Sequence, residues 1–163
     1  MPGAGKTTVA PHAAGLLGAP WCDLDQRIVA RARQPITEIF TTHGERYFRA
    51  LERAAMVDVL AEPPQVVATG GGWAAEADNI AAVGGRALLI YLSLTPAEAA
   101  GRLAGSGDRP LLADAPPVSR ITELLQARER WYRLADIEIA VGQTTPAAVA
   151  DSIAVAARQH GGW

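Results

Sequence analysis

The sequence of 163 residues fits one domain of ordinary size, and 49% of its residues are hydrophobic, which argues against a disordered chain. The formal net charge of -2 argues against a nucleic-acid-binding protein, and no stretch approaches the roughly 20 apolar residues of a membrane span. With one cysteine, Cys22, no internal disulfide can form, which suits the reducing cytoplasm. We also expect a monomer.

The chain opens with MPGAGKTT, which matches most of the phosphate-binding pattern G-x-x-x-x-G-K-[ST]. Glycines let backbone N–H groups surround a phosphate, and a helix predicted over residues 7–17 adds the partial positive charge of its N-terminus. Lys6 can then reach the terminal phosphates, and the Thr7 hydroxyl can hold Mg²⁺. The alternative is a glycine-rich turn with an exposed lysine. The first glycine of the pattern, and the strand that should lead into it, would both precede Met1.

Residues 20–25 read as a short strand that ends in two acids, Asp23 and Asp25. On a strand their side chains share one face, about 6–7 Å apart, while Leu24 points into packing. One carboxylate could then serve a metal while the other reaches a substrate hydroxyl. The alternative is a helix N-cap at Asp25 beside a solvated acid.

The periodicity is helical from about residue 26 to residue 60, with breaks near Pro35 and Gly44. Within this region Arg46, Arg49 and Arg53 share one side of a helix. Glu52 follows Arg49 by three residues and can hold its guanidinium in place. From spacing alone, a solvated ladder of ion pairs is favoured over a ligand site.

A buried strand at 65–72 runs into the triple glycine of residues 70–72, whose bare N–H groups could meet an anion or form a flexible turn. The uniformly apolar run 86–94 is the clearest strand, and Thr95 then caps a helix beginning at Pro96. Residues 105–110 form a loop in which Arg109 could close over phosphates. A helix over 119–134, a strand over 137–141 and a helix over 146–158 complete the chain. The helix over 119–134 carries four arginines, among which spacing cannot choose: Arg120, Arg128, Arg130 and Arg133.

Alternation of strands and helices predicts an α/β fold with a mostly parallel sheet covered on both faces, forming one domain over residues 1–163. In such sheets ligands bind at the carboxyl ends of the strands. The phosphate loop, the acidic pair and the triple glycine all fall at such ends. This convergence predicts one shared site.

Taken in order, the segments GAGKTT, DLD, FR, GGG, RPLL and RERWY resemble shikimate kinase, and the resemblance extends from residue 1 to about residue 150. It implies a P-loop NTPase fold similar to the nucleoside-monophosphate kinases, in three α/β/α layers. It also implies a mobile substrate-binding region at about 26–60 and a lid at about 104–118. The implied reaction is ATP-dependent phosphorylation of the 3-hydroxyl of shikimate, with Mg²⁺ as cofactor.

The resemblance implies a role for each candidate residue. The implied ligands of ATP are Gly3, Ala4, Gly5, Lys6, Thr7, Thr8, Arg102 near the adenine, and the lid arginine Arg109. The metal would be held by Thr7 and, through its water shell, by Asp23. Shikimate would be bound by Asp25, Arg49, Gly70, Gly71, Gly72 and Arg128. The implied catalytic residues are Lys6, Asp25 and Arg109.

Three departures from the family pattern carry expectations of their own. The strand before Met1 is central to the family's sheet, so we expect a gap between its neighbours. Trp73 stands where the family usually has a small residue, so we expect it to crowd the substrate pocket or stack beside it. Residues 141–148 lack the basic residue often found beside the adenine. The alternatives are another P-loop kinase of polyhydroxy acids, such as a gluconate-type kinase, or a non-catalytic relative that binds shikimate or nucleotide.

Overall fold

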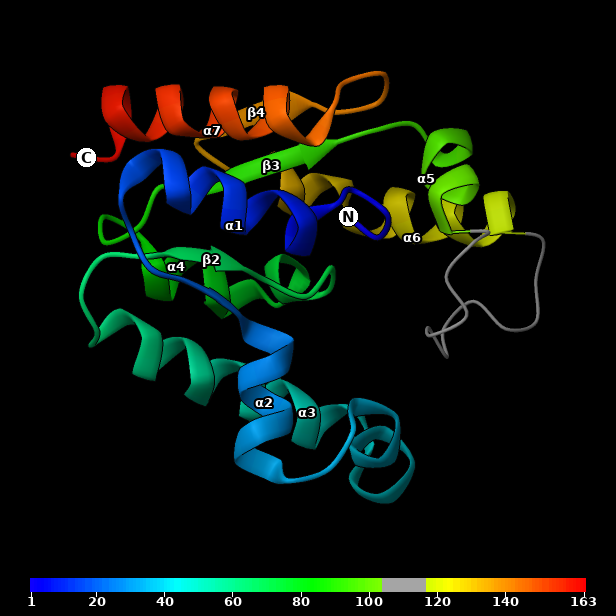
Figure 1. Cartoon of the computed structure of the whole chain (residues 1–163). Coiled ribbons are helices and arrows are strands. Elements are labelled where there is room, and N and C mark those ends of the chain that lie inside the picture. The colour runs from blue at the N-terminus through cyan, green and yellow to red at the C-terminus, as the bar shows by residue number, and fades with distance from the viewer. Residues whose placement is uncertain (104–116) are drawn as a thin grey trace.

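The computed structural model describes residues 1–103 and 117–163, and in it helices flank short parallel strands (Figure 1). In chain order the elements are α1 (Lys6–Leu17), β1 (Trp21–Asp23), α2 (Leu24–Ala32), α3 (Ile36–Leu60), β2 (Val66–Ala68), the 3-10 helix η1 (Trp73–Ala75), α4 (Ala77–Val83), β3 (Ile90–Ser93), α5 (Pro96–Leu103), α6 (Pro117–Tyr132), β4 (Ile137–Ala140) and α7 (Pro146–His160). The predicted alternation is confirmed, with η1 and α4 as additions to it. None of the described helices is long and apolar enough to cross a membrane.

The described strands form two parallel pairs, β1 with β2 and β3 with β4. Among these residues β2 and β3 are not hydrogen-bonded to each other, so the sheet is divided where the gap was expected. Figure 1 shows β2 and β3 running in the same direction. Their carboxyl ends therefore face the same side of the molecule, on which the phosphate loop also lies.

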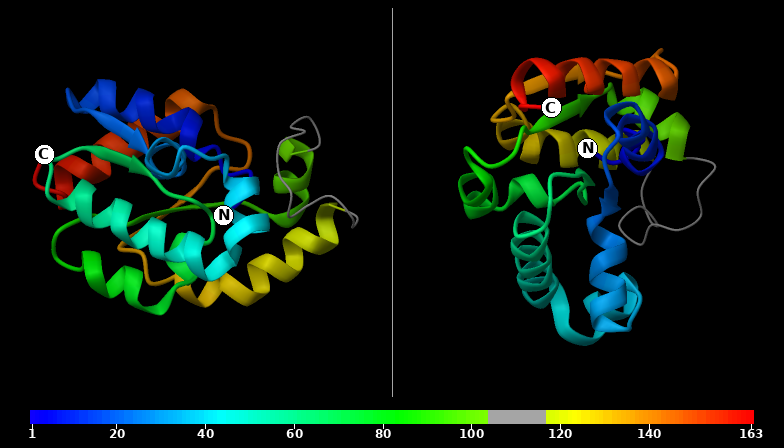
Figure 2. Two further views of the ribbon diagram at one scale, coloured as in Figure 1. Left: turned by 90° about the horizontal axis from the view of Figure 1, so that it is seen from below. Right: turned by 60° about the vertical axis from the view of Figure 1, so that its left-hand side comes forward.

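Helices cover both faces of the strands, as predicted, with α1 and α7 on one face and α4 and α6 on the other (Figure 2). One buried apolar cluster joins α1, α5, α6 and α7 to β3, and includes Ala13, Ile121 and Ile153. A second cluster lies under α2, α3 and α4, and includes Leu24 and Ile28. Burial of these side chains fixes the helices against the strands.

The helical region that follows β1 projects away from the strands (Figure 1). Its breaks fall where the sequence predicts them, because Pro35 precedes the first residue of α3 and Gly44 interrupts that helix with φ 79° and ψ 172°. A positive φ is strained for residues with a Cβ, so glycine suits this position. This region carries Arg49 toward the strand ends.

The observed strands are all shorter than the predicted ones. The strand expected over 20–25 ends at Asp23, because the Asp23 carboxylate accepts hydrogen bonds from the backbone N–H groups of Asp25 and Gln26 and so caps α2. The strand expected over 86–94 begins only at Ile90. The cap predicted at Thr95 is confirmed, since its hydroxyl accepts from the N–H of Glu98 while the Glu98 carboxylate accepts from the N–H of Thr95.

Candidate active site

The phosphate loop borders a cavity of about 400 Å³ at the amino end of α1, and each residue from Gly3 to Thr8 lines it. Gly3 and Gly5 have φ values of 73° and 80°, which residues with side chains rarely adopt. The Lys6 ammonium donates to the carbonyl of Met1 at 2.8 Å, which places it across the loop. The loop therefore offers the backbone shape and the positive charge that an anion site needs.

Thr7 and Asp23, the two predicted metal ligands, are in direct contact. The Thr7 hydroxyl donates to Asp23 Oδ2 at 2.7 Å, although 16 residues separate them in sequence. Both residues line the same cavity. A hydroxyl and a carboxylate are hard oxygen donors that suit Mg²⁺, which is commonly held by one or two protein groups together with substrate phosphates and water. The residues present therefore fit the implied cation.

Asp25 lies on the first turn of α2, so the prediction that both acids sit on one strand is wrong. Its side chain nevertheless reaches the cavity that the phosphate loop borders. A Cβ built at Gly70 would lie 2.9 Å from Asp25 Oδ1 and 3.1 Å from Glu52 Oε1. The two carboxylates thus approach the glycine turn together, and a side chain at Gly70 would displace them.

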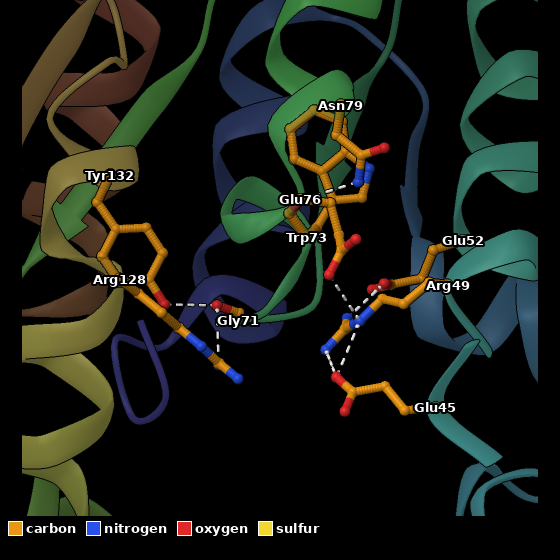
Figure 3. Close-up of polar contacts among 9 residues, drawn as sticks. All are labelled: Glu45, Arg49, Glu52, Gly71, Trp73, Glu76, Asn79, Arg128 and Tyr132. Carbon is orange, nitrogen blue, oxygen red and sulfur yellow. Dashed lines mark hydrogen bonds and ion pairs between the residues drawn. The ribbon is translucent and has the colours of Figure 1, made fainter. Parts of the chain in front are cut away.

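Arg49 is not among the residues that line this cavity, but it is buried beside the glycine turn and is not part of a solvated ladder of ion pairs. Only 9% of the residue is exposed, and its Nη1 donates to Glu52 Oε2 at 2.5 Å. Its Nη2 donates to Glu45 Oε1 at 2.8 Å (Figure 3). Burial opposes its charge, but Glu52 and Glu45 outweigh burial and raise the pKa of Arg49. Arg46 and Arg53 on the same helix are exposed.

Arg128 approaches the glycine turn from α6, on the other side from Arg49 (Figure 3). Its Nη1 lies 3.5 Å from the carbonyl oxygen of Gly71, and the Tyr132 hydroxyl donates to the same oxygen at 2.5 Å. A Cβ at the neighbouring Gly72 would meet Arg49 Nη2 at 2.6 Å. Two guanidinium groups from distant helices therefore flank two consecutive glycines.

Trp73 is not among the residues that line the cavity, so the expectation that it crowds the pocket is wrong, while the alternative that it stacks beside the substrate stays a prediction. It is only 3% exposed and packs in the cluster that contains Leu24 and Phe48. The 3-10 turn that begins at Trp73 directs its indole into the core beneath α3 and α4. The side-chain amide of Asn79 donates to the Trp73 carbonyl at 2.8 Å and so joins η1 to α4 (Figure 3).

The far end of the cavity is lined by Val141, Thr144, Pro146 and Val149, together with Arg102 from α5. Arg102 donates to the carbonyls of Val141 and Gly142 at 2.5 and 2.8 Å, which braces this wall. The predicted adenine-side residue therefore lines the same cavity as the phosphate loop. Arg109 and most of the predicted lid lie outside the described residues.

Comparison with known proteins places this site in a family. The family model described as shikimate kinase matches residues 2–158. The shikimate kinase of Saccharopolyspora erythraea is 41% identical over 158 residues, which cover 93% of this chain and 87% of that protein. The chain belongs to the shikimate kinase family. The resemblance read from the short sequence segments is thereby confirmed.

Further shikimate kinases agree with this assignment in sequence and in structure. The enzyme of Caldanaerobacter subterraneus is 38% identical over 151 residues, covering 93% of this chain and 88% of that protein. The shikimate kinase from Acinetobacter baumannii, solved in complex with shikimate, superposes with a TM-score of 0.89 at 31% identity, covering 98% of this chain and 89% of that one. The enzyme from Aquifex aeolicus gives a TM-score of 0.82 at 28% identity, with 98% and 94% covered. The predicted fold class is confirmed.

Three residues that contact the predicted site residues were not identified from the sequence. Tyr132 lies four residues after Arg128, so helical spacing could have placed both on one face of α6. Glu45 precedes Arg49 by four residues and could have been found in the same way. Glu76, whose Oε1 lies 3.4 Å from Arg49 Nε, comes from another element and gives no local signal.

We expect Gly72→Ala to raise the KM for shikimate by about tenfold or more while leaving the KM for ATP unchanged, because the added Cβ would push the Arg49 guanidinium aside. Gly72 has a φ of −95°, which alanine adopts readily, so backbone strain would not explain such an effect. Steady-state kinetics with each substrate varied in turn would measure the effect. Gly15→Ala is the matched control, since a Cβ there meets no atom within 4 Å. An unchanged KM for shikimate in Gly72→Ala would contradict the placement of Arg49.

Proposed function

We propose that this protein transfers the terminal phosphate of ATP to the 3-hydroxyl of shikimate, giving shikimate 3-phosphate and ADP. The observation that carries the proposal is the position of Arg49 and Arg128 on either side of the Gly71 turn, beside the phosphate-loop cavity. A carboxylate on shikimate can bind both guanidinium groups and the N–H of Gly71. Its hydroxyls would then lie toward Asp25.

The chemistry of each assigned side chain supports a specific role in this reaction. Residues from Gly3 to Thr8 hold the phosphates, and Lys6 neutralises negative charge on the group being transferred. Asp25 orients the attacking hydroxyl or accepts its proton. Thr7 and Asp23 would hold Mg²⁺, which supplies further charge neutralisation when bound. Gly70 and Gly72 keep space for the neighbouring side chains. Arg109, assigned by resemblance, would meet the transferred phosphate.

We further propose that the protein acts as a monomer in the cytoplasm. The described residues assigned to the reaction all come from one chain, so their arrangement needs no second subunit. ATP and Mg²⁺ are both available in that compartment. Light scattering coupled to gel filtration would give the mass of the particle, and a dimer would contradict the monomer.

Coupled ADP release with shikimate and a panel of other polyhydroxy acids, including gluconate, tests the activity. We expect turnover with shikimate and none with gluconate, because a gluconate-type kinase would keep the phosphate loop but would not need the FR, GGG and RERWY segments together. Turnover with gluconate in preference to shikimate would assign a different small-molecule kinase. Shikimate binding without ADP release would assign a non-catalytic binding protein.

A further inference from the structure

The Arg49 guanidinium is surrounded by more negative charge than it can balance. Among the described residues, three carboxylates lie within ion-pair distance of it, namely those of Glu45, Glu52 and Glu76 (Figure 3). The N···O distances are 2.8, 2.5 and 3.4 Å respectively. One positive charge thus faces three negative charges at the place assigned to a substrate carboxylate.

Glu76 differs from both other carboxylates in its position in the chain and in its contact with Arg49. Glu45 and Glu52 lie on α3 one turn from Arg49 and accept hydrogen bonds from it. Glu76 comes from the segment between η1 and α4, and its 3.4 Å contact with Nε is an ion pair without a hydrogen bond. Its side chain is 38% exposed, which lies between the 1% of Glu52 and the 62% of Glu45. Glu76 is therefore more easily exchanged than Glu45 or Glu52, because its departure leaves the hydrogen bonds of Arg49 intact.

The balance of charges around Arg49 also favours a substrate carboxylate that replaces Glu76 over one that binds beside it. Burial raises the pKa of Glu52 and outweighs the hydrogen bond and charge of Arg49, which lower it, while the nearby charges of Asp25 and Glu76 act in the same direction as burial. Negative charge is thus already costly at this position. A carboxylate that arrived while Glu76 stayed in place would add to the repulsion, whereas one that replaced it would keep the charge unchanged.

We propose that Glu76 holds the place of the substrate carboxylate on Arg49 and is displaced when an acid binds. Glu76 is then a specificity-determining residue, because a neutral polyol brings no charge to exchange and leaves the ion pair closed. Every acid that binds must compete with Glu76, so its affinity is lower than Arg49 and Arg128 would otherwise give. The inference rests on the proposed function, which assigns Arg49 to the acid group of the substrate.

Calorimetric titration of shikimate into the wild-type protein, Glu76→Gln and Asp78→Asn tests this competition. Glutamine keeps the shape of the side chain and removes its charge. A partly exposed ion pair contributes up to about 1 kcal/mol, so we expect the Kd for shikimate to fall by about twofold to fivefold in Glu76→Gln. Asp78 is an exposed acid two residues further along, and its neutralisation should leave the Kd unchanged. In steady-state kinetics the KM for shikimate should fall in Glu76→Gln while the KM for ATP stays constant.

An unchanged or weaker affinity for shikimate in Glu76→Gln would overturn the inference, as would an equal gain in Asp78→Asn. Weaker affinity would mean that Glu76 positions Arg49 for the acid. In either case wild-type turnover of shikimate, measured on the same preparation, would leave the proposed function standing. A wild-type protein that neither binds nor phosphorylates shikimate would overturn both.

Discussion

Replacing Lys6 by alanine should lower kcat by about a hundredfold to a thousandfold while leaving the Kd for shikimate nearly unchanged. Phosphoryl transfer depends mainly on alignment and on stabilising charge on the transferred group, and a preorganised donor of this kind is worth about 3–4 kcal/mol. Lys6 borders the cavity at the phosphate loop, whereas Arg49 and Arg128, the proposed ligands of the acid, lie at the glycine turn. Turnover and shikimate binding should therefore respond separately.

Single-turnover kinetics and shikimate titration would measure these two quantities in Lys6→Ala. Lys6 is the only lysine in the sequence, which offers a second measurement without mutation. An amine-specific reagent can label only this side chain and the chain's amino terminus, and mass spectrometry separates the two products. We expect ATP with Mg²⁺ to protect Lys6 and shikimate not to protect it. A Lys6→Ala variant with near wild-type kcat would remove the assigned role of the phosphate loop.

Replacing Arg49 by lysine should raise the KM for shikimate by about tenfold to a hundredfold and leave the KM for ATP unchanged. Lysine keeps the charge but loses the planar fork that can meet a carboxylate and Glu52 together. Loss of one charge-assisted hydrogen bond costs about 1.5–3 kcal/mol, which sets the expected range. Steady-state kinetics with each substrate varied would show the separation. Equal changes in both KM values would refute the assignment of Arg49 to the acid.

The variant Arg49→Ala must be compared with a double variant in which the charge of Glu52 is also removed. Arg49→Ala would leave the buried Glu52 carboxylate without its counter-charge, which typically costs about 3–5 kcal/mol of stability. Arg49→Ala with Glu52→Gln removes that buried charge, so we expect the double variant to melt at a higher temperature than Arg49→Ala yet still bind shikimate poorly. Arg53→Ala is the control, since Arg53 is exposed on the same helix. Normal shikimate binding in the double variant would show that Arg49 is only structural.

The sequence alone was sufficient to predict the structural features that depend on a few consecutive residues. Gly3 and Gly5 predict the loop, because other residues rarely adopt its positive φ values. Pro35 and Gly44 predict the breaks in the helical region for equally local reasons. The short segments in order were sufficient for the family, and with it for the pairing of Arg49 and Arg128 as candidate ligands of one acid.

Tertiary packing decided the contacts between distant segments, which no local pattern specifies. The Asp23 carboxylate became a helix cap in contact with Thr7, because α1 and the end of β1 meet at the cavity. Trp73 turned inward because a hydrophobic cluster under α3 and α4 accommodates its indole. Glu76 reached Arg49 only because the segment after the glycine turn packs beside α3. Backbone preferences are encoded residue by residue, whereas the partner of a side chain is fixed only when separate elements are buried against one another.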